Sequence, residues 1–252
     1  MNASLSEITV FIDALLDIKN VADWPNALNG LQFANMGRVA KIGAAVDACE
    51  AVLEMAAKAE VDLLLVHHGM FWGGLQPVTG AAYRKAQRAI RADLAVYSAH
   101  LPLDLHPALG NNALLARAIG LEATEPFFFE KGRNIGLKAA VRMPLDDLIA
   151  RTEKATGGPV KTVRGGPAMA GRVGIVTGGA GGEVQRAAAE GVDTFITGEG
   201  PHHSALLAEE LGVNLLLAGH YATETFGVKA LAAHVAEKFG LPWQFFDYPT
   251  GL

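Results

Sequence analysis

Cysteine is almost absent from this sequence, since Cys49 is the only one among 252 residues. A single thiol cannot close a disulfide within the chain, and it excludes metal sites built from several cysteine ligands. Because disulfides mark oxidising compartments, their absence favours a cytoplasmic protein.

Long apolar runs and blocks of basic residues are also missing. No apolar segment approaches the length of about 20 residues that spans a membrane, and Met1–Glu7 lacks the basic start and apolar core of a signal peptide. The formal net charge is -5, the isoelectric point is about 5.9, and no zinc-finger spacing occurs. We therefore expect neither a membrane nor a nucleic acid as partner.

Several motifs of nucleotide and ester chemistry are lacking. The chain has no Gly-x-Ser-x-Gly nucleophile elbow and no Gly-Lys-Ser/Thr phosphate loop. The glycine-rich stretch 177–183 departs from Gly-x-Gly-x-x-Gly because Val184 occupies the third glycine position. This stretch is interpreted as a tight turn between a strand and a helix, and nothing favours a serine hydrolase.

What the sequence does contain indicates a folded α/β protein with a large core. Half of the residues are hydrophobic, 19% are charged, and 29 are glycine. After an amphipathic helix that begins near Ser6, apolar runs typical of strands alternate with segments of helical composition. The predicted strands cover 39–46, 61–66 and 94–99. The predicted helices cover 49–60, 80–91 and 145–156, and the Pro, Asn and Gly content of 24–32 predicts a loop. Such alternation favours layered sheets with largely parallel pairing.

The second half of the chain repeats the plan of the first. Ile42-Gly43 aligns with Val173-Gly174, and 61–65 aligns with 192–196, both at an offset of 131; 94–100 aligns with 214–220 at an offset of 120. We predict two similar α/β lobes, 1–125 and 126–252 with a boundary near Pro126, that face each other across a cleft. The alternative is a chance match of two generic strand–helix–strand stretches.

Histidines and acidic residues follow the predicted strands, where ligands bind in open α/β sheets. Six of them are candidate metal ligands, with four more in reserve: His67, His68, His100, Asp104, His220 and Glu224, then Glu199, His106, His202 and His203. Imidazole and carboxylate donors without sulfur suit Zn, Mn, Fe or Co. Adjacent strand residues point to opposite faces, so two neighbouring ions fit His67 and His68 better than one.

Simpler interpretations exist for each residue taken alone. His67 and His68 would cap a sheet, His100 would bond backbone in a turn, and Asp104 would cap a helix. The paired pattern His-x-x-x-Asp and His-x-x-x-Glu argues against these simpler interpretations. Glu224 is expected on the first turn of a helix over 223–239. The nearest basic residues, Arg84, Lys85 and Arg88, are interpreted as a solvated helix face and offer no clear phosphate clamp.

Taken together, the motifs resemble a known family. These are His-His-Gly-x-Phe-Trp (67–72), His-Leu-Pro-Leu-Asp-x-His-Pro (100–107) with Gly-Asn-Asn (110–112), Phe-Ile-Thr-Gly-Glu (195–199) and Ala-Gly-His-x-Ala-Thr-Glu (218–224), with Asn-Gly-Leu-Gln (29–32). The sequence resembles the Nif-three-like dinuclear metal-centre proteins, named as GTP cyclohydrolase I type 2 homologues, in their short bacterial form.

The resemblance implies a function and an assembly. Its implied ligands for two divalent ions (Zn, Fe, Mn or Co) are His67, His68, Asp104, His220 and Glu224. His100 is implied as a proton-handling residue, and Glu199 is a second candidate for that role. The expected protein is a toroidal homohexamer, a trimer of dimers, that hydrolyses a purine nucleotide with metal-activated water. Two alternatives stay open: a metal-binding hexameric scaffold or regulator without turnover, and a two-metal phosphoesterase.

Overall fold

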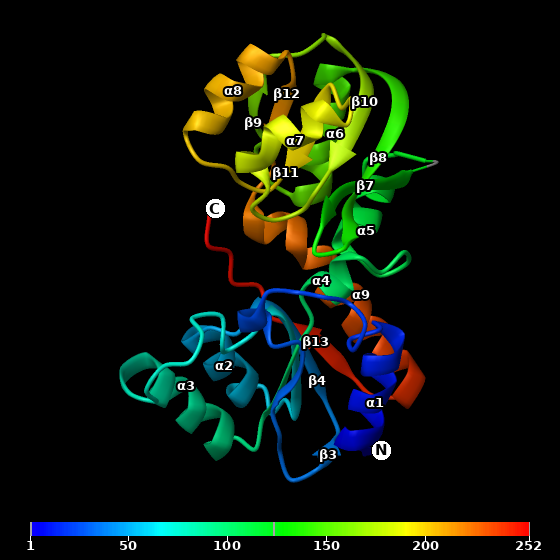
Figure 1. The fold of residues 1–252 in the computed structure, drawn as a ribbon. Coiled ribbons are helices and arrows are strands. Elements are labelled where there is room, and N and C mark those ends of the chain that lie inside the picture. Colours follow the sequence, from blue (N-terminus) through cyan, green and yellow to red (C-terminus); the bar gives the residue numbers. More distant parts are fainter. Residues whose placement is uncertain (1, 123, 252) are drawn as a thin grey trace. The chain divides into compact units, whose positions relative to one another are not determined.

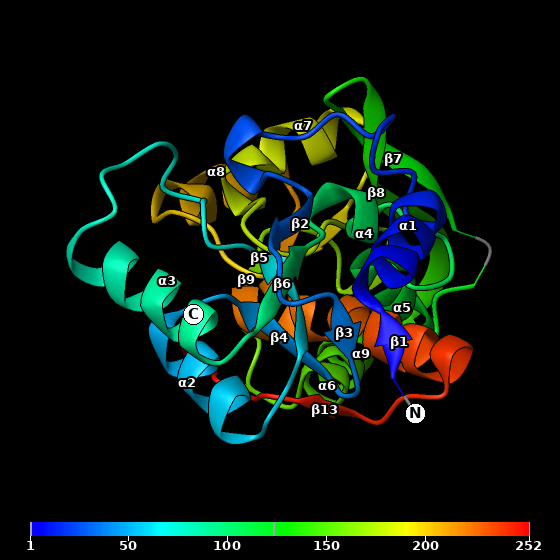
Figure 2. The same ribbon diagram turned by 90° about the horizontal axis from the view of Figure 1, so that it is seen from below.

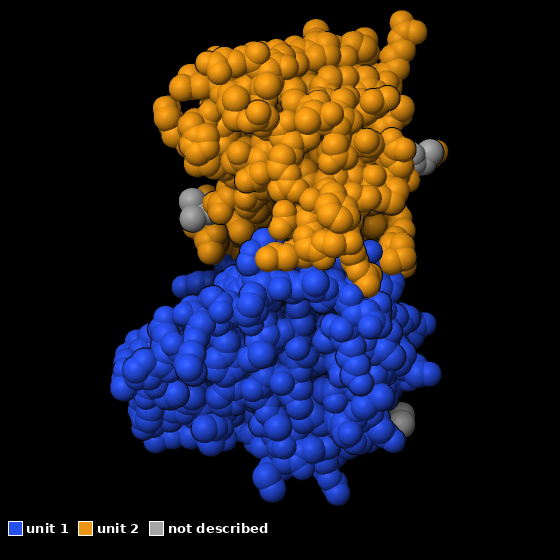
Figure 3. All heavy atoms as spheres, viewed as in Figure 1, with its two compact units in different colours: residues 1–106, 227–248 blue, residues 107–226, 249–252 orange. Residues whose placement is uncertain are grey.

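The computed structural model describes residues 2–122 and 124–251. Its chain divides into two compact units, shown in two colours in Figure 3: unit 1 comprises residues 1–106 and 227–248, and unit 2 comprises residues 107–226 and 249–252. The described residues include no helix that combines the length and the apolar character needed to cross a membrane.

This division differs from the boundary expected near Pro126. Pro126 lies inside strand β7 (Glu125–Glu130), which belongs to the sheet of unit 2. Residues 107–125 join unit 2, in which α5 (Asn111–Ala118) packs against the sheet. Residues 227–248 join unit 1, where β13 (Trp243–Phe245) pairs with β4 (Ile42–Asp47).

The sheet of unit 1 has five strands in the order β13–β4–β5–β6–β2. The first four are parallel to one another, and β2 is antiparallel to β6. The remaining bounds are β5 (Leu63–His68), β6 (Ala95–Ser98) and β2 (Gly30–Phe33), with β1 (Ala3–Ser4) and β3 (Arg38–Val39) as a separate antiparallel pair. The helical segments up to residue 106 are α1 (Leu5–Leu15), η1 (Pro25–Ala27), α2 (Glu50–Lys58), α3 (Gly80–Arg91) and α4 (Leu101–Asp104).

Both faces of this sheet are covered. Leu64 and Val66 of β5 pack with Val52 and Leu53 of α2 in one apolar cluster. Side chains that alternate with these lie on the opposite face, where the Tyr97 hydroxyl donates a 2.6 Å hydrogen bond to Asp13 of α1. Figure 1 accordingly shows α2 on one side of the strands of unit 1 and α1 on the other. The carboxyl ends of β4, β5 and β6 are therefore the part of the sheet left for a site.

The sheet of unit 2 has six strands in the order β7–β8–β10–β11–β12–β9. Its three central strands are parallel and the outer ones antiparallel to their neighbours. The bounds are β8 (Arg133–Pro144), β9 (Lys161–Arg164), β10 (Met169–Ile175), β11 (Thr194–Thr197), β12 (Asn214–Leu217), α6 (Leu145–Thr156), η2 (Gly181–Glu183), α7 (Val184–Ala189), α8 (His203–Leu211) and α9 (His220–Phe239). Helices α5 and α6 pack on one face of this sheet, while Figure 2 shows α7 and α8 on the other side.

The predicted internal repeat is present in three parallel strands of each unit. β4, β5 and β6 are neighbours in unit 1, and β10, β11 and β12 are neighbours in the same order in unit 2. Ile42 lies opposite Leu63 and Val173 lies opposite Thr194, so both residues of the first pair recur 131 positions later (173 − 42 and 194 − 63). The third strand differs by one position, because Ala95 lies opposite Leu63 and Asn214 lies opposite Thr194, an offset of 119 (214 − 95) and not the predicted 120.

Some helices and strands match the bounds predicted from the sequence, and others differ from them. Helices α3 and α6 cover the segments predicted for them, 80–91 and 145–156. Strand β5 extends to His68, so the two histidines end the strand instead of following it. Part of the segment predicted as a loop, 24–32, forms β2, which among the described strands pairs with β6 alone. Helix α9 begins at His220 and not near Thr223, so His220 and Glu224 both lie on its first turns.

The hydrogen bond between Tyr97 and Asp13 generates a stability prediction. Burial, with the hydrogen bond to Asp13 and its charge, raises the pKa of Tyr97, so its hydroxyl stays neutral and donates. We expect Tyr97→Phe to lower the free energy of unfolding by about 1–3 kcal/mol, because a partly buried carboxylate loses its donor. Urea denaturation measures this. Tyr83→Phe is the control, since Tyr83 is 51% exposed; equal effects of both changes would contradict the interpretation.

Candidate metal centre

The first cluster of candidate ligands lies at the carboxyl end of the unit 1 sheet and comprises His67, His68, His100 and Asp104. One ring nitrogen from each of the three histidines lies within 4.8 Å of the others. His67 is fully buried and the other three are at most 9% exposed. The Asp104 carboxylate lies 3.5 Å from Nε2 of His67. Four metal-ligating groups from two strand ends and one short helix thus converge.

His67 and His68 come together although they are neighbours in the sequence. Their ring centroids are 4.9 Å apart, where the sequence predicted opposite faces. They sit at the last two positions of β5, and each ring is fixed by a different neighbour. Nδ1 of His67 lies 2.9 Å from the Ala99 carbonyl after β6, and Nδ1 of His68 lies 2.9 Å from the Asp47 carboxylate of β4. The chain then leaves the sheet at Gly69, where a side chain would collide with Gln32.

His100 is held by a buried carboxylate that precedes η1. Both oxygens of Asp23 lie 3.0 Å from Nδ1 of His100, and Asp23 also accepts hydrogen bonds from Leu101 N and Asn29 Nδ2. Asn29 in turn accepts the backbone N–H of His100 at 2.7 Å. Burial raises the pKa of Asp23, but the hydrogen bond to His100 and its charge outweigh it and lower the pKa below its usual value. Asp23 therefore stays ionised and orients the His100 ring.

The second cluster lies in unit 2 and comprises Glu199, His220 and Glu224. Nδ1 of His220 is 2.9 Å from Glu199 and Nε2 is 3.2 Å from Glu224. Glu224 lies one helical turn after His220 on α9 and is only 3% exposed. Burial lowers the pKa of His220, but the hydrogen bonds and charges of Glu224 and Glu199 outweigh it and raise the pKa to about 9. Carboxylates that favour a cationic ring also favour a divalent cation.

Glycines allow two loops to pack closely around the second cluster. Gly198 and Glu199 both donate backbone hydrogen bonds to the Gly178 carbonyl, and a side chain at Gly198 would meet the backbone of His220. In the glycine-rich stretch 177–183, backbone N–H groups donate to Asn112, Thr223, Thr197 and Glu199. Those donors are already used within unit 2, so the stretch serves as a structural turn and not as a phosphate cradle.

The donors in both clusters fit a divalent metal. The Ala99 carbonyl can only accept, so His67 carries its hydrogen on Nδ1 and its lone pair on Nε2, which is the form that binds metal. His68, His100 and His220 have carboxylates at the same position, the usual support for ligating histidines. Nitrogen and oxygen donors without sulfur suit Zn, Mn, Fe or Co.

Three of the four reserve residues, His106, His202 and His203, are not found in a group of potential metal ligands in the described part of the chain. His202 and His203 are exposed at the start of α8, and His106 is half-buried beyond α4. Among the described residues, none of the three appears in a group of ligands close enough to share an ion. The fourth reserve residue, Glu199, lies 2.9 Å from the candidate ligand His220.

The sequence interpretation missed the residues that hold the histidines. Asp47 and Asp23 were not singled out, and Asn29 and Gln32 entered only as part of a motif. Asp47 ends β4, one residue beyond the strand predicted over 39–46, and lies opposite His68 of β5. Asp23 offers no comparable signal, because its contact with His100 spans 77 positions of the chain.

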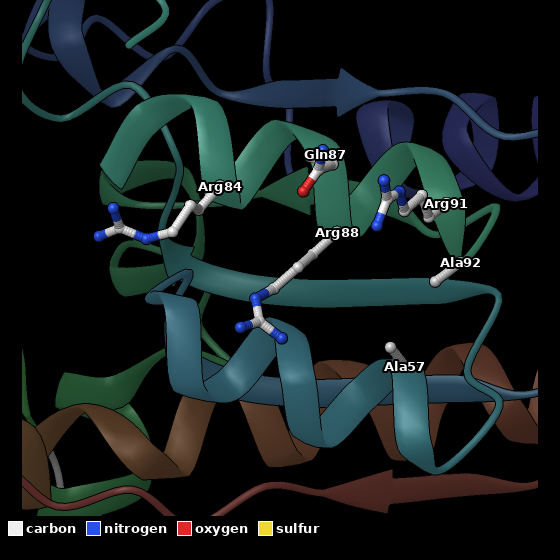
Figure 4. A pocket seen from close by; sticks show the side chains of 6 residues that line it. All are labelled: Ala57, Arg84, Gln87, Arg88, Arg91 and Ala92. Carbon is white, nitrogen blue, oxygen red and sulfur yellow. The ribbon is translucent and has the colours of Figure 1, made fainter. Parts of the chain in front are cut away.

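A basic pocket lies apart from both clusters, between α2 and α3 of unit 1. It has a volume of about 380 Å³ and is lined by the residues labelled in Figure 4: Ala57, Arg84, Gln87, Arg88, Arg91 and Ala92. Arg84 pairs with Glu50 at 2.9 Å, and Arg88 pairs with Glu54 at 3.0 Å. Arg84 and Arg88 thus join two helices and are already paired with carboxylates, which makes these two arginines poor candidates for a phosphate clamp.

Comparison with known proteins places the chain in a family. Residues 3–250 match the family described as Duf34/NIF3 (NGG1p interacting factor 3). The chain belongs to the Duf34/NIF3 family. Relatives in this family include proteins of Deinococcus radiodurans (45% identity, 90% of this chain and 87% of the relative) and Pyrococcus abyssi (41% identity, 98% of each chain), both named "GTP cyclohydrolase 1 type 2 homolog".

Solved structures agree with this assignment to the Duf34/NIF3 family. TTHA1606 from Thermus thermophilus aligns with a TM-score of 0.91 and 41% identity over 99% of this chain and all of the other. Reduced HcgD from Methanocaldococcus jannaschii aligns with a TM-score of 0.88 and 27% identity over 98% of this chain and 99% of the other. The resemblance noted in the motifs is thereby confirmed, and so is the mixed α/β fold with several sheets flanked by helices.

The glycine at position 178 yields a prediction for the second cluster. Gly178 has a φ of +76°, and a side chain there would collide with the Glu224 carboxylate. Gly157 has the same φ of +76° with open space around it. We expect Gly178→Ala and Gly157→Ala to lose similar stability, about 1–2 kcal/mol from the left-handed backbone, while only Gly178→Ala lowers the bound divalent metal. Elemental analysis and thermal unfolding measure the two effects, and equal metal contents would contradict the prediction.

Proposed function

We propose that the protein is a dinuclear metal-dependent hydrolase of the GTP cyclohydrolase type. The observation that carries this proposal is the repeated arrangement of histidine and carboxylate at equivalent strand ends of the two units. In unit 1, His100 and Asp104 bound the helix that follows β6; in unit 2, His220 and Glu224 begin the helix that follows β12. Each of the candidate histidines also has the acceptor at Nδ1 that a ligating or proton-handling imidazole requires.

We propose that ligands from the two units hold a pair of ions. In this proposal the ions are held by His67, His68 and Asp104 from unit 1 and by His220 and Glu224 from unit 2. Five protein ligands shared between two ions leave coordination positions for water and substrate, as a catalytic site requires. When bound, such ions supply Lewis acidity that lowers the pKa of water from about 15.7 towards about 7.

We propose that two residues of this chain, His100 and Glu199, move protons. His100 is 9% exposed and has its Nδ1 fixed by Asp23, so Nε2 is the atom that takes up or releases a proton. The Glu199 side chain is 45% exposed and contacts His220, which lets it exchange protons with solvent. We assign general acid and base roles to these two groups.

The substrate proposal rests on the relatives. The Deinococcus radiodurans and Pyrococcus abyssi proteins are named as homologues of a GTP cyclohydrolase, so a purine nucleotide is the substrate class to test first. The reaction would be hydrolytic attack on an electrophilic ring carbon such as C8. The same clusters without turnover describe the second candidate, a metal-binding scaffold or regulator.

Removal of single ligands tests the metal assignment. We expect the purified protein to hold close to two ions per chain, and His68→Ala and Glu224→Ala each to lose bound metal while keeping the far-ultraviolet circular dichroism of the fold. His203→Ala is the matched control, because His203 is an exposed histidine outside both clusters. Full metal content in both ligand variants would refute the ligand assignment.

Incubation of the metal-loaded protein with GTP tests the reaction. Loss of the purine absorbance in the original protein and not in His68→Ala or Glu224→Ala supports the hydrolase. Two bound ions with no consumption of GTP or other purine nucleotides would favour the scaffold, and absence of metal would overturn both proposals.

Assembly and location complete the proposal. We propose that the chain forms a cytoplasmic homohexamer, the assembly that the family resemblance implies. Light scattering coupled to size exclusion should then give six times the chain mass of 26.5 kDa. A monomer or dimer that retains full metal and activity would contradict the hexamer and leave the metal assignment intact.

A further inference from the structure

Two of the three tryptophans in the chain stand beside the first cluster. The Trp72 and Trp24 rings both meet His100 edge to face, with centroids 4.8 Å and 5.7 Å away at interplanar angles of 68° and 63°. Trp72 is 37% exposed and Trp24 is 41% exposed. Large apolar rings that remain this exposed next to buried polar groups are a feature of binding surfaces.

The Trp72 ring is oriented by the cluster itself. It stacks on His68 with a centroid distance of 5.4 Å and an interplanar angle of 27°. Its neighbour Phe71 stacks on Phe33 of β2 at 6.2 Å, which fixes the start of the loop that carries Trp72. The Trp72 indole therefore lies against a candidate ligand without being sealed into the core.

Trp24 is held by the same carboxylate that orients His100. Its backbone N–H donates to Asp23 at 2.7 Å, and Asp23 accepts from the His100 ring. Gln32 ties the two aromatic segments together, because it donates to the carbonyls of Ala27 and Leu28 and accepts from Met70. The positions of both indoles are thus built into the hydrogen bonds that shape the first cluster.

We infer that Trp72 and Trp24 form an aromatic wall that binds the planar heteroaromatic ring of the substrate beside the first cluster. The inference rests on the proposed function and deepens it by naming residues that determine specificity. Indole faces stack on flat π-systems of any base, whereas a sugar or an aliphatic acid gains much less from them.

Calorimetric titration of the full-length protein, as purified with its metal, tests the wall. The probes are guanosine, GTP and tripolyphosphate, which has no ring. We expect Trp72→Leu and Trp24→Leu each to lower the affinity for guanosine and for GTP by about tenfold. The affinity for tripolyphosphate should stay unchanged. Trp72→Phe should recover most of the affinity, because stacking is restored. Trp243→Leu is the control: Trp243 is also 37% exposed but lies on β13, at the opposite edge of the sheet from β2.

The outcomes separate this inference from the hydrolase proposal. The aromatic wall would be refuted if both leucine variants kept the original affinity for guanosine, even if GTP is still hydrolysed. It would also be refuted if they lost affinity for tripolyphosphate to the same degree as for guanosine. Failure of the original protein to bind any of a panel of purine and pyrimidine nucleosides would overturn it as well. Selective weakening of nucleosides without any turnover would support the wall and reject the hydrolase. Metal content and circular dichroism of each variant show whether the cluster and the fold are intact.

Discussion

The candidate site depends on one constraint, the fixing of Nδ1 of every candidate histidine by an acceptor from its own unit. The Ala99 carbonyl holds His67, and carboxylates hold the other three: Asp47 for His68, Asp23 for His100 and Glu199 for His220. Each contact sets the ring orientation and leaves Nε2 for a metal or a proton. Because Ala99 and Asp47 lie at the ends of strands next to β5, the pairing of these strands sets the ring orientations of His67 and His68. The positions of these two rings are therefore set by the hydrogen-bonded strands of the sheet.

The two units share the order of three parallel strands but carry different side chains at the strand ends. Three parallel strands recur in the same order, the first two of them in the same register, and a histidine and an acid four residues later follow the third strand in both. In unit 1, two further histidines at the end of β5 make the cluster rich in imidazole. In unit 2 the equivalent stretch is Gly198-Glu199-Gly200, so carboxylates dominate. The raised pKa of His220 reflects that difference in charge.

Both units need glycine where chain segments pack closely, but at different positions. In unit 2, side chains at Gly178 or Gly198 would strike Glu224 or the His220 backbone, so these glycines let two loops close around the carboxylates. In unit 1, the lack of a side chain at Gly69 leaves room for Gln32. The Gln32 side chain connects η1 to the loop that carries Trp72. The glycine-rich stretch that looks like a phosphate loop in the sequence is thus part of the packing of the second cluster.

The sequence by itself determined the α/β class, the repeated strands and the family, because these follow from local periodicity and from motifs of neighbouring residues. Helices α3 and α6 and the candidate ligands His67, His68, Asp104, His220 and Glu224 could all be read there. Only the tertiary structure decided the remainder: the pairing of β13 with β4, the return of residues 227–248 to unit 1, and the contacts of Asp23 and Trp72 with His100. Those features join residues far apart in the chain, and their energy arises only when packing brings the partners together, so no local pattern encodes them.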